Sequence, residues 1–593
     1  MTEPIRIANC SGFYGDRLSG AREMVEGGPI DVLTGDWLAE LTMLILARSR
    51  ASRPRGGFAR TFVTQMEQVM GTCLDRGIKV VSNAGGLDPD GCAEAVAEVA
   101  EKLGLSPTIA YVSGDDLLPR AAELAEAGAL RPFEEGGDLG DVGAYLSANA
   151  YLGCWGIVDA LERGADIVVT GRVTDAAVTC GPAAWHHGWS RTDLDALAGA
   201  VVAGHVIECS GQATGGNYSF FTEVPGMERV GFPWAEVAAD GSSVIGKHDG
   251  TGGQVSIGTV TSQLLYEIGG ARYLGPDVTA RFDTITLEEV GPDRVRISGV
   301  RGEAPPDTLK VAMNELGGHR NEVTIKLTGL DIDAKAAVAS AAFWEACPYG
   351  PGDFASVTER VERTEHDDPE SNEQATATWR LIVKDADERK VGRAFANAMV
   401  ETALSSIPGL YGGGGPSGGS PYGVYRPALV PADLVPAHVT MLGGDTREVP
   451  STFAGAEVAP IEPTPGPALA VPAGPATATP LGTLVGARSG DKGGDANLGV
   501  FVRDDLAWAW LDDLLTTERL QQLLPETADL VVDRHAFPNL RALNFVIRGL
   551  LQEGVAASTR NDAQAKSLGE WLRARVVDIP DALLGEQGHG IPL

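Results

Sequence analysis

Five short apolar stretches in the first 175 residues each run into a turn of glycine and polar residues. The stretches are Ile5–Cys10, Ile30–Leu33, Val80–Val81, Ile109–Val112 and Ile167–Val169. Short apolar runs that end in turn residues are typical of buried β-strands. If the five strands are parallel, all five turns lie along one edge of one sheet. Open α/β sheets bind ligands at that carboxyl edge, so we expect a site there.

Helical spacing of apolar residues separates these strands. It predicts helices over Trp37–Ser49, Gly91–Leu103, Asp116–Glu126 and Ala144–Arg163. Asp36 is placed to cap the first helix, and Gly164 is placed to end the last. Strands that alternate with helices predict an α/β fold, with a mostly parallel, Rossmann-like sheet flanked by helices.

The 593 residues are too many for one core, so we expect several domains. Residues 1–449 are predicted to form a large N-terminal α/β region. Its main sheet lobe covers residues 1–310, and an α+β sub-lobe covers residues 311–449. Residues 450–480 are rich in Pro and Ala and are predicted to form an extended linker. Residues 481–593 are predicted to form a small α/β domain.

The net charge and the cysteines indicate which partners and which cellular compartment to expect. The formal net charge is −33, which disfavours nucleic acid and anionic membranes as partners. A small-molecule substrate with negative charge would therefore need a local basic pocket. Seven cysteines without a paired spacing favour a reducing cytoplasm. The longest apolar stretch, near Leu41–Ala47, is too short to span a membrane, and nothing near the N-terminus resembles a signal peptide.

The first and third turns are candidates for ligand contact through the backbone. In the first, Ser11, Gly12 and Tyr14 lie where N–H groups at a helix start would hold an anion. The sequence there matches neither a dinucleotide fingerprint nor a P-loop. In the third, Asn83 precedes Gly85 and Gly86, which permit close approach of a ligand. A plain tight turn explains either stretch as well.

Two further stretches carry charged side chains. Arg172, Thr174 and Asp175 follow the fifth strand, and Arg172 is suited to clamp a carboxylate or phosphate. The alternative is an internal Arg172–Asp175 pair that fixes the loop. His248 next to Asp249 predicts a proton shuttle, although a lone histidine also serves as a structural hydrogen-bond donor.

The C-terminal region has one candidate anion site, and the chain lacks several standard motifs. Arg488 and Lys492 lie in a glycine-rich connection that predicts anion binding or an ordered hairpin. No histidine or cysteine spacing typical of a metal site occurs, so no metal is predicted, although scattered acids leave Mg²⁺ open. The chain has no G-x-S-x-G nucleophile elbow.

Taken together, the turn sequences resemble the acyclic terpene utilisation (AtuA-like) family. The matching stretches are Asn9–Asp16, Thr34–Glu40, Ser82–Gly86, Thr170–Asp175 and Ser489–Gly494. The resemblance covers nearly the whole chain. It implies a large N-terminal domain and a small ferredoxin-like C-terminal domain. It also implies a role in bacterial catabolism of citronellol- or geraniol-like compounds through CoA thioesters, but it supplies no catalytic residues.

The leading hypothesis is a lyase that hydrates or dehydrates a branched or terpenoid-derived acyl-CoA, or a related carboxylate. Such chemistry needs acid–base groups and oxyanion donors, but no cofactor beyond the coenzyme A of the substrate. Proton transfer is assigned to Asp36, Asp115, Asp175 or His248. The enolate oxygen is assigned to backbone N–H groups of Gly12, Gly85 and Gly86, and the anionic end to Arg172 or Lys492.

Two alternatives stay open. One is a non-catalytic acyl-CoA-binding or accessory subunit, and the other is a metal-assisted hydrolase. A homo-oligomer is expected in each case.

Overall fold

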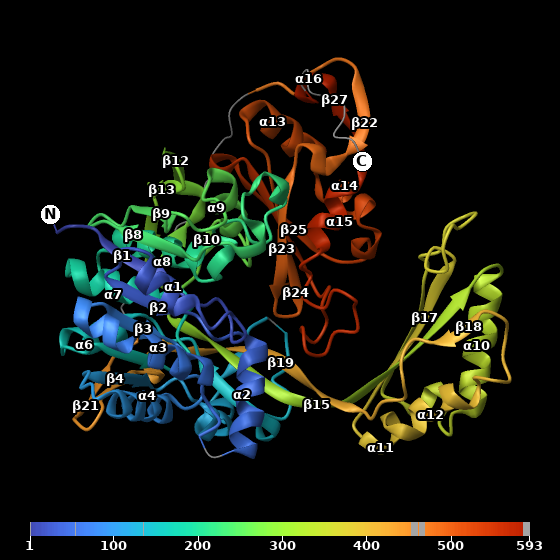
Figure 1. Cartoon of the computed structure of the whole chain (residues 1–593), viewed down its shortest axis with the longest axis horizontal. Coiled ribbons are helices and arrows are strands. Elements are labelled where there is room, and N and C mark those ends of the chain that lie inside the picture. The colour runs from blue at the N-terminus through green and yellow to red at the C-terminus, as the bar shows by residue number, and fades with distance from the viewer. Residues whose placement is uncertain (1, 54, 135, 452–460, 462–468, 585–593) are drawn as a thin grey trace. The chain divides into compact units, whose positions relative to one another are not determined.

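The computed structural model describes residues 2–53, 55–134, 136–451, 461 and 469–584 (Figure 1). The chain forms two compact units. Unit 1 comprises Met1–Asn314, Tyr425–Val555 and Gln564–Leu593, and unit 2 comprises Glu315–Val424 and Ala556–Ala563. The N-terminal sheet and the C-terminal domain therefore belong to the same unit.

The five predicted strands lie side by side and parallel in the middle of the large sheet of unit 1. In spatial order they are β1 (Ile5–Asn9), β2 (Val32–Gly35), β3 (Lys79–Ser82), β7 (Ile167–Thr170) and β4 (Ile109–Ser113). Because neighbouring strands run in the same direction, their five turns share the carboxyl edge of the sheet. This prediction is confirmed.

The sheet as a whole is mixed, so "mostly parallel" holds only for its centre. Antiparallel strands extend it on both sides to eleven. Next to β1 lie β8 (Pro233–Val237), β9 (Ser243–Lys247), β13 (Arg294–Ser298) and β12 (Thr286–Gly291), and next to β4 lie β20 (Ala437–Met441) and β21 (Thr446–Val449). Pairs such as β8–β9 and β20–β21 are joined by short loops, which permit only antiparallel pairing.

Helices cover both faces of the parallel strands, each over its own core. One group consists of α1 (Gly20–Gly27), α3 (Arg60–Arg76) and α4 (Pro89–Leu103), and the other of α6 (Trp155–Glu162), α7 (Ala177–His187) and α8 (Leu194–Ile207). Alternate strand residues enter different cores: Ile7 belongs to one and Ala8 to the other. With both faces covered, the strand ends are the part of the sheet that a ligand can reach.

Two local predictions are wrong. The predicted helix Ala144–Arg163 is a strand, β6 (Tyr145–Ala150), followed by α6 alone. Five of the six residues of β6 are buried, and such a buried run has no periodicity that separates strand from helix. Asp36 does not cap α2 (Glu40–Ser52), because that helix begins four residues later and has Ala39 as its N-cap.

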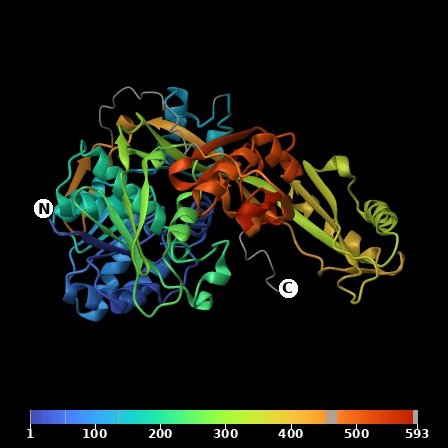
Figure 2. The ribbon, with the colours of Figure 1, turned by 90° about the horizontal axis from the view of Figure 1, so that it is seen from above.

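The C-terminal domain has a four-stranded antiparallel sheet with its own core. Its order is β23 (Gly486–Lys492), β24 (Asp495–Phe501), β26 (Ala542–Ile547) and β25 (Val532–Phe537). The helices α13 (Asp505–Leu514), α14 (Thr517–Leu523) and α15 (Leu568–Arg573) complete it. In Figures 1 and 2 this domain lies beside α9 (Ile257–Leu264), which contacts β23 and β24.

Smaller elements complete unit 1. They are α5 (Ala121–Glu126), β5 (Arg131–Pro132), β10 (Arg272–Tyr273), β11 (Thr279–Arg281), β14 (Arg301–Glu303), β22 (Ala476–Pro480), β27 (Val576–Pro580) and α16 (Asp581–Leu584). Strand β22 pairs with β27, so the end of the predicted linker is a strand. Much of the rest of that linker, residues 452–460 and 462–468, lies outside the described residues.

Unit 2 is an α+β unit with a separate aromatic core. It holds β16 (Ser356–Glu362), β17 (Thr376–Asp385), β18 (Leu410–Gly412), α10 (Ile332–Ala346), α11 (Glu388–Val391) and α12 (Arg393–Glu401). The long strands β15 (Thr308–Thr328) and β19 (Ser420–Pro431) run through both units. Phe343, Trp379 and Phe395 lie at the centre of its core.

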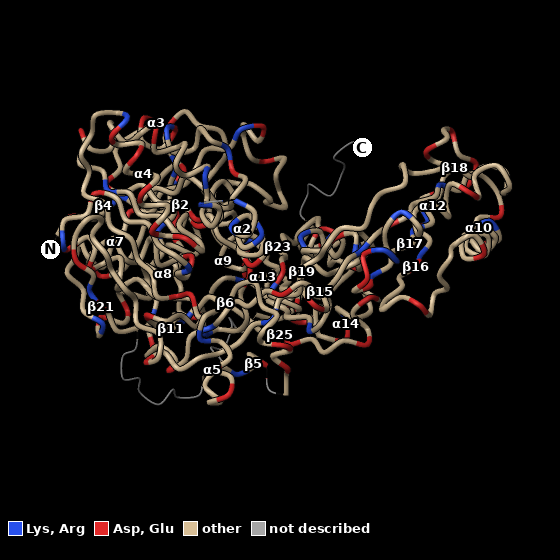
Figure 3. The backbone as a smooth tube through the Cα atoms, turned by 90° about the horizontal axis from the view of Figure 1, so that it is seen from below, with Lys and Arg blue, Asp and Glu red and all other residues tan. Residues whose placement is uncertain are grey.

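Charged residues of both signs are interspersed along the chain, with no basic stretch to offset the acidic excess (Figure 3). Among the described residues, no helix combines the length and the apolar character needed to cross a bilayer.

Candidate active site

Asp36 is a buried carboxyl group at the end of β2, held by the neighbouring strand. Asn83, which follows β3 and is 0% exposed, donates its Nδ2–H to Oδ1 of Asp36 at 2.5 Å. The Oδ1 atom of Asn83 accepts the N–H of Trp37 at 2.8 Å, which fixes the orientation of the amide. Two adjacent parallel strands therefore cooperate to fix the position of one acid.

Arg172 is a buried cation at the end of β7. Its guanidinium lies 4.1 Å from the ring centroid of Tyr151, and Nη1 is 2.7 Å from Oδ1 of Asp175. Only 2% of the Arg172 side chain is exposed, and its Nε–H has no hydrogen-bond partner among the described residues. The internal Arg172–Asp175 pair is therefore present, and the role of Arg172 as a clamp for a carboxylate or phosphate stays a prediction.

Asp115, after β4, holds the backbone that carries Arg172. Its Oδ2 atom accepts the Arg172 N–H at 2.9 Å and the Asn149 Nδ2–H at 2.7 Å. Burial raises the pKa of Asp115 to about 7. With these contacts to backbone and amide, Asp115 is placed to position the β7 turn.

Glu208 joins this group from the C-terminal end of α8. Asn9, the last residue of β1, donates to the carbonyl oxygen of Glu208 at 2.8 Å. The carboxylate Oε1 lies 3.3 Å from Nδ1 of His205, while Oε2 has no partner among the described residues. Burial lowers the pKa of His205 to about 4, so this imidazole is neutral at pH 7.

Asp36 and Glu208 both have raised pKa values, which favours their neutral forms. Burial and the charge of Asp175 raise the pKa of Asp36, and the same two causes raise the pKa of Glu208. The Arg172 cation opposes both shifts but does not reverse them. Protonated carboxyl groups beside a fixed cation are suited to general acid catalysis.

The C-terminal domain fixes one further acid, Glu267. Its N–H donates to Oδ1 of Asn497 at 2.8 Å, and its φ of +56° is a left-handed conformation unusual for this residue type. Asn544, hydrogen-bonded to Asn497, donates to the carbonyl oxygens of Ile268 and Gly269 on the same turn. Burial raises the pKa of Glu267. A strained residue held by buried amides is typical of functional sites.

Lysines from two different regions belong to the same neighbourhood. The Lys310 amine, on β15, is 3.3 Å from Oε1 of Glu40 and 4.9 Å from the ring centroid of Tyr151. Lys310 and Arg172 lower the pKa of Glu40 to about 2, although burial alone would raise it. Lys492, at the end of β23, has its amine 3.5 Å from the Glu267 carbonyl oxygen. The side chains of Lys310 and Glu40 keep 36% and 29% exposure, so solvent reaches this part of the site.

Most residues of the glycine turns that were predicted to contact a ligand make contacts within the fold instead. The N–H of Gly12 donates to Asp16, and the N–H of Gly86 faces the Asn83 carbonyl oxygen, so neither is free for an enolate oxygen. A Cβ on Gly85 would lie 2.5 Å from the Thr170 carbonyl oxygen, which makes glycine necessary for packing. The Ser11 hydroxyl donates to the Phe13 carbonyl oxygen, and Tyr14 packs against the core beneath α1.

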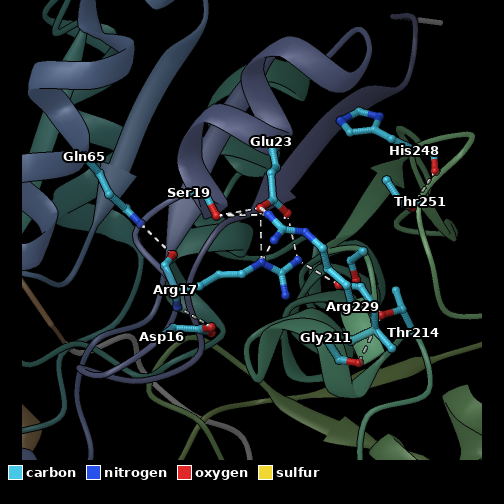
Figure 4. Close-up of polar contacts among 12 residues, drawn as sticks. Asp16, Arg17, Ser19, Glu23, Gln65, Gly211, Thr214, Arg229, His248 and Thr251 are labelled. Atoms are coloured by element: carbon cyan, nitrogen blue, oxygen red, sulfur yellow. Dashed lines mark hydrogen bonds and ion pairs between the residues drawn. The ribbon is translucent and has the colours of Figure 1, made fainter. Parts of the chain in front are cut away.

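The remaining predicted residues fall in different places. Nε2 of His248 contacts the Met24 carbonyl oxygen within α1. The carbonyl oxygen of His248 accepts the Thr251 hydroxyl (Figure 4). Its catalytic role stays a prediction, and we leave it out of the site. The Thr174 N–H donates to the Leu152 carbonyl oxygen.

Arg488, in the C-terminal domain, is almost fully buried, and its guanidinium lies 4.0 Å from the ring centroid of Tyr266. It donates a hydrogen bond to Gln212, and its Nε–H has no hydrogen-bond partner among the described residues.

Among the residues that the structure describes, no group of three or more His, Cys, Asp and Glu side chains is arranged to hold a metal ion.

Comparison of the chain with protein-family models supports the family resemblance of the turn sequences. A family model described as "Acyclic terpene utilisation family protein AtuA" matches residues 5–441, and one for the AtuA ferredoxin-like domain matches residues 479–578. The chain belongs to the AtuA family. The resemblance inferred from the turns is therefore confirmed, as is the ferredoxin-like character of the C-terminal domain. A comparison with curated proteins gave no match, and neither did one with solved structures.

Sequence reasoning missed five charged residues of this AtuA family site: Glu40, Asp491, Glu208, Lys310 and Glu267. Two of them, Glu40 and Asp491, lie inside the stretches that carry the family resemblance, which could have identified them. Burial raises the pKa of Asp491 to about 8, and Glu267 adds to the shift. Glu208 and Lys310 carry no local signal, since α8 and β15 bring them to the site from distant positions.

Proposed function

We propose that this chain is an acid–base enzyme that adds water to, or removes water from, a branched or terpenoid-derived acyl-CoA or a related carboxylate. One observation carries the proposal. Asp36, a carboxyl group with a raised pKa, lies in the same buried group as Arg172, a cation whose Nε–H has no hydrogen-bond partner among the described residues. This pairing supplies a proton and a stabiliser of negative charge without a redox cofactor.

In the hydration direction, water adds across a carbon–carbon double bond next to the thioester carbonyl. Asp175, whose side chain is 29% exposed, accepts one proton from the attacking water, and the remaining hydroxyl bonds to the β-carbon. Asp36 gives its proton to the α-carbon as the π bond breaks. The Arg172 Nε–H donates to the thioester carbonyl oxygen. Negative charge develops on this oxygen after the hydroxyl bonds to the β-carbon and before the α-carbon receives its proton.

The surrounding residues support these roles by position. Asn83 orients Asp36, and Asp115 anchors the backbone of Arg172. Glu208 is a second acid with a raised pKa in the same group and serves as an alternative proton donor. The family name supports the substrate class, because acyclic terpenes are branched chains.

The test uses the purified full-length protein and a panel of branched enoyl-CoA and 3-hydroxyacyl-CoA esters. We expect interconversion of at least one pair, followed by mass spectrometry as gain or loss of one water. The Asp36→Asn variant should lose this activity, whereas Glu322→Gln, in unit 2, should keep it. Binding of an ester without any turnover would contradict the proposal and favour a non-catalytic acyl-CoA-binding subunit.

The proposal extends to two further properties. We take the enzyme to need no cofactor beyond the coenzyme A of its substrate, so activity should survive dialysis against a chelator. We also take it to be a homo-oligomer, which light scattering on the purified protein would test.

A further inference from the structure

We propose that Lys310 and Lys492 form a subsite that binds an oxyanion of the substrate, apart from the proton-transfer group around Asp36. The inference rests on the proposed function, since it assigns a second contact to the same substrate. It identifies the ligand as one that carries a carboxylate or phosphate group in addition to its reacting carbons.

Lys310 lies in an aromatic and acidic frame formed by Tyr151, Tyr425 and Glu40. Its amine lies 4.9 Å from the ring centroid of Tyr151 and 5.7 Å from that of Tyr425. Glu40, 3.3 Å away, accepts one of its three N–H donors. Tyr151 also donates to Glu40 at 3.2 Å, which holds this carboxylate toward the lysine. Lys310 thus has a fixed position and donors to spare.

Lys492 reaches the same place from the C-terminal domain. It precedes a two-residue hairpin turn in which Gly493 has a φ of +66°. A Cβ on Gly493 would lie 3.4 Å from the Tyr425 ring, so the turn packs close to the aromatic frame of Lys310. Among the described residues, the Lys492 amine contacts only the Glu267 carbonyl oxygen, at 3.5 Å, and it forms no ion pair.

Two like charges in one neighbourhood favour an anion between them. Burial and the charge of Lys310 together lower the pKa of Lys492 to about 8, although the charges of Glu267 and Glu40 act in the other direction. Burial raises the pKa of Glu267 and brings that of Asp491 to about 8, which favours the neutral form of these two nearby acids. An oxyanion would relieve the repulsion and accept charged hydrogen bonds from both amines.

These two lysines supply the local positive charge that an anionic substrate requires in a chain with a net charge of −33. Lysine is a common phosphate ligand and binds carboxylates equally as a point charge. The oxyanion is therefore either a phosphate of the coenzyme A moiety or a free carboxylate of the acid itself.

Calorimetric titration of the full-length protein separates these sources. The ligands are coenzyme A, inorganic phosphate and a branched 2-enoate, each measured with the wild type and with Lys310→Met and Lys492→Met. We expect each substitution to weaken the ligand that carries the relevant group by about 10- to 100-fold, the effect of losing a charged hydrogen bond. A loss for coenzyme A and phosphate identifies the phosphate, and a loss for the enoate alone identifies the carboxylate.

Lys102→Met is the matched control, because Lys102 is an exposed surface lysine paired with Glu67. Its affinities should equal those of the wild type, and thermal melting should show all variants folded. If the wild type binds none of the three ligands, or if both lysine variants keep its affinities, the subsite is wrong. Because binding is measured without turnover, a protein that binds as expected but converts no ester refutes the proposed reaction and leaves the subsite standing.

Discussion

The two units treat their acidic residues in opposite ways. In unit 2, Glu322 pairs with Arg380 at 2.6 Å, and although its partial burial works the other way, the hydrogen bond and charge of Arg380 lower its pKa. In unit 1, Asp36 and Glu208 lie near Arg172, yet burial and Asp175 raise the pKa of both. A cation nearby is common to the two cases, so the difference comes from burial and from the crowding of acids.

This contrast separates charges that stabilise a fold from charges gathered for chemistry. An acid paired at a partly exposed surface loses little solvation and keeps its charge. Several acids buried together cannot all ionise, so some keep their protons at neutral pH. Groups with such raised pKa values and unused donors are concentrated at active sites. The edge of the parallel strands in unit 1 has both properties.

The largest expected effect is on turnover, when an acid of unit 1 is replaced and compared with an acid of unit 2. Replacing Asp36 with Asn keeps an oxygen that can accept the Asn83 amide but removes the proton that the acid delivers. We expect turnover to fall by about 100- to 10,000-fold, the usual contribution of a general acid. Steady-state kinetics with Glu322→Gln as the control measures it. Equal losses in the two variants would mean that the acids of the units do not differ in role.

The next largest effect is on kcat when Arg172 of unit 1 is replaced, compared with the same change at Arg380 of unit 2. In Arg172→Lys the planar group over Tyr151 and the free Nε–H are lost, while the positive charge remains. We expect a roughly 100-fold loss of kcat, comparable to removing an oxyanion donor. The corresponding Arg380→Lys change in unit 2 should leave kcat unchanged. A fully active Arg172→Lys enzyme would show that charge alone suffices and that the donor geometry is irrelevant.

The comparison also predicts opposite pH dependences of stability. The pKa of Asp115 rises from 3.8 to about 7 on folding, so between these values the folded chain keeps a proton that the unfolded chain loses. Its stabilising contribution is complete below pH 4 and is lost as the pH rises through 7. The effect is on the order of 4 kcal/mol. Glu322, with a lowered pKa, contributes stability above its unfolded pKa that is lost as the pH falls.

Thermal melting from pH 4 to pH 8 tests this difference in sign. Asp115→Asn should flatten the decline between pH 4 and pH 7, because Asn keeps an acceptor for the Arg172 N–H and never ionises. Glu322→Gln should leave that decline in place. An unchanged decline in Asp115→Asn would place the titrating group elsewhere in the chain.

The smallest effect concerns the strain at Glu267. Glycine adopts its φ of +56° without penalty, so Glu267→Gly should raise the free energy of unfolding by about 1 kcal/mol. Turnover should fall in the same variant, because the acid is gone. Denaturant unfolding and kinetics on one preparation check both. A variant that is less stable than the wild type would show that Glu267 serves the fold.

The sequence predicted the edge of the sheet but only part of what lies on it. Asp36 and Asn83 directly follow β2 and β3, and Arg172 and Asp175 lie in the turn after β7, so local pattern and parallel topology suffice to bring them together. Glu208 and Lys310 come from the end of a helix and from a 21-residue strand, and their positions depend on packing between distant elements. Glu267 depends on Asn497 and Asn544 of another domain, which no local pattern predicts.

Infrared spectroscopy tests the protonation of Asp36 most directly. The difference spectrum between wild type and Asp36→Asn at pH 7 isolates the band of this one carboxyl group. If burial keeps Asp36 neutral, a protonated carboxyl band disappears in the variant, as it should for Glu208→Gln but not for Glu322→Gln. Loss of an ionised carboxylate band from Asp36→Asn would contradict the neutral acid on which the proposed chemistry depends.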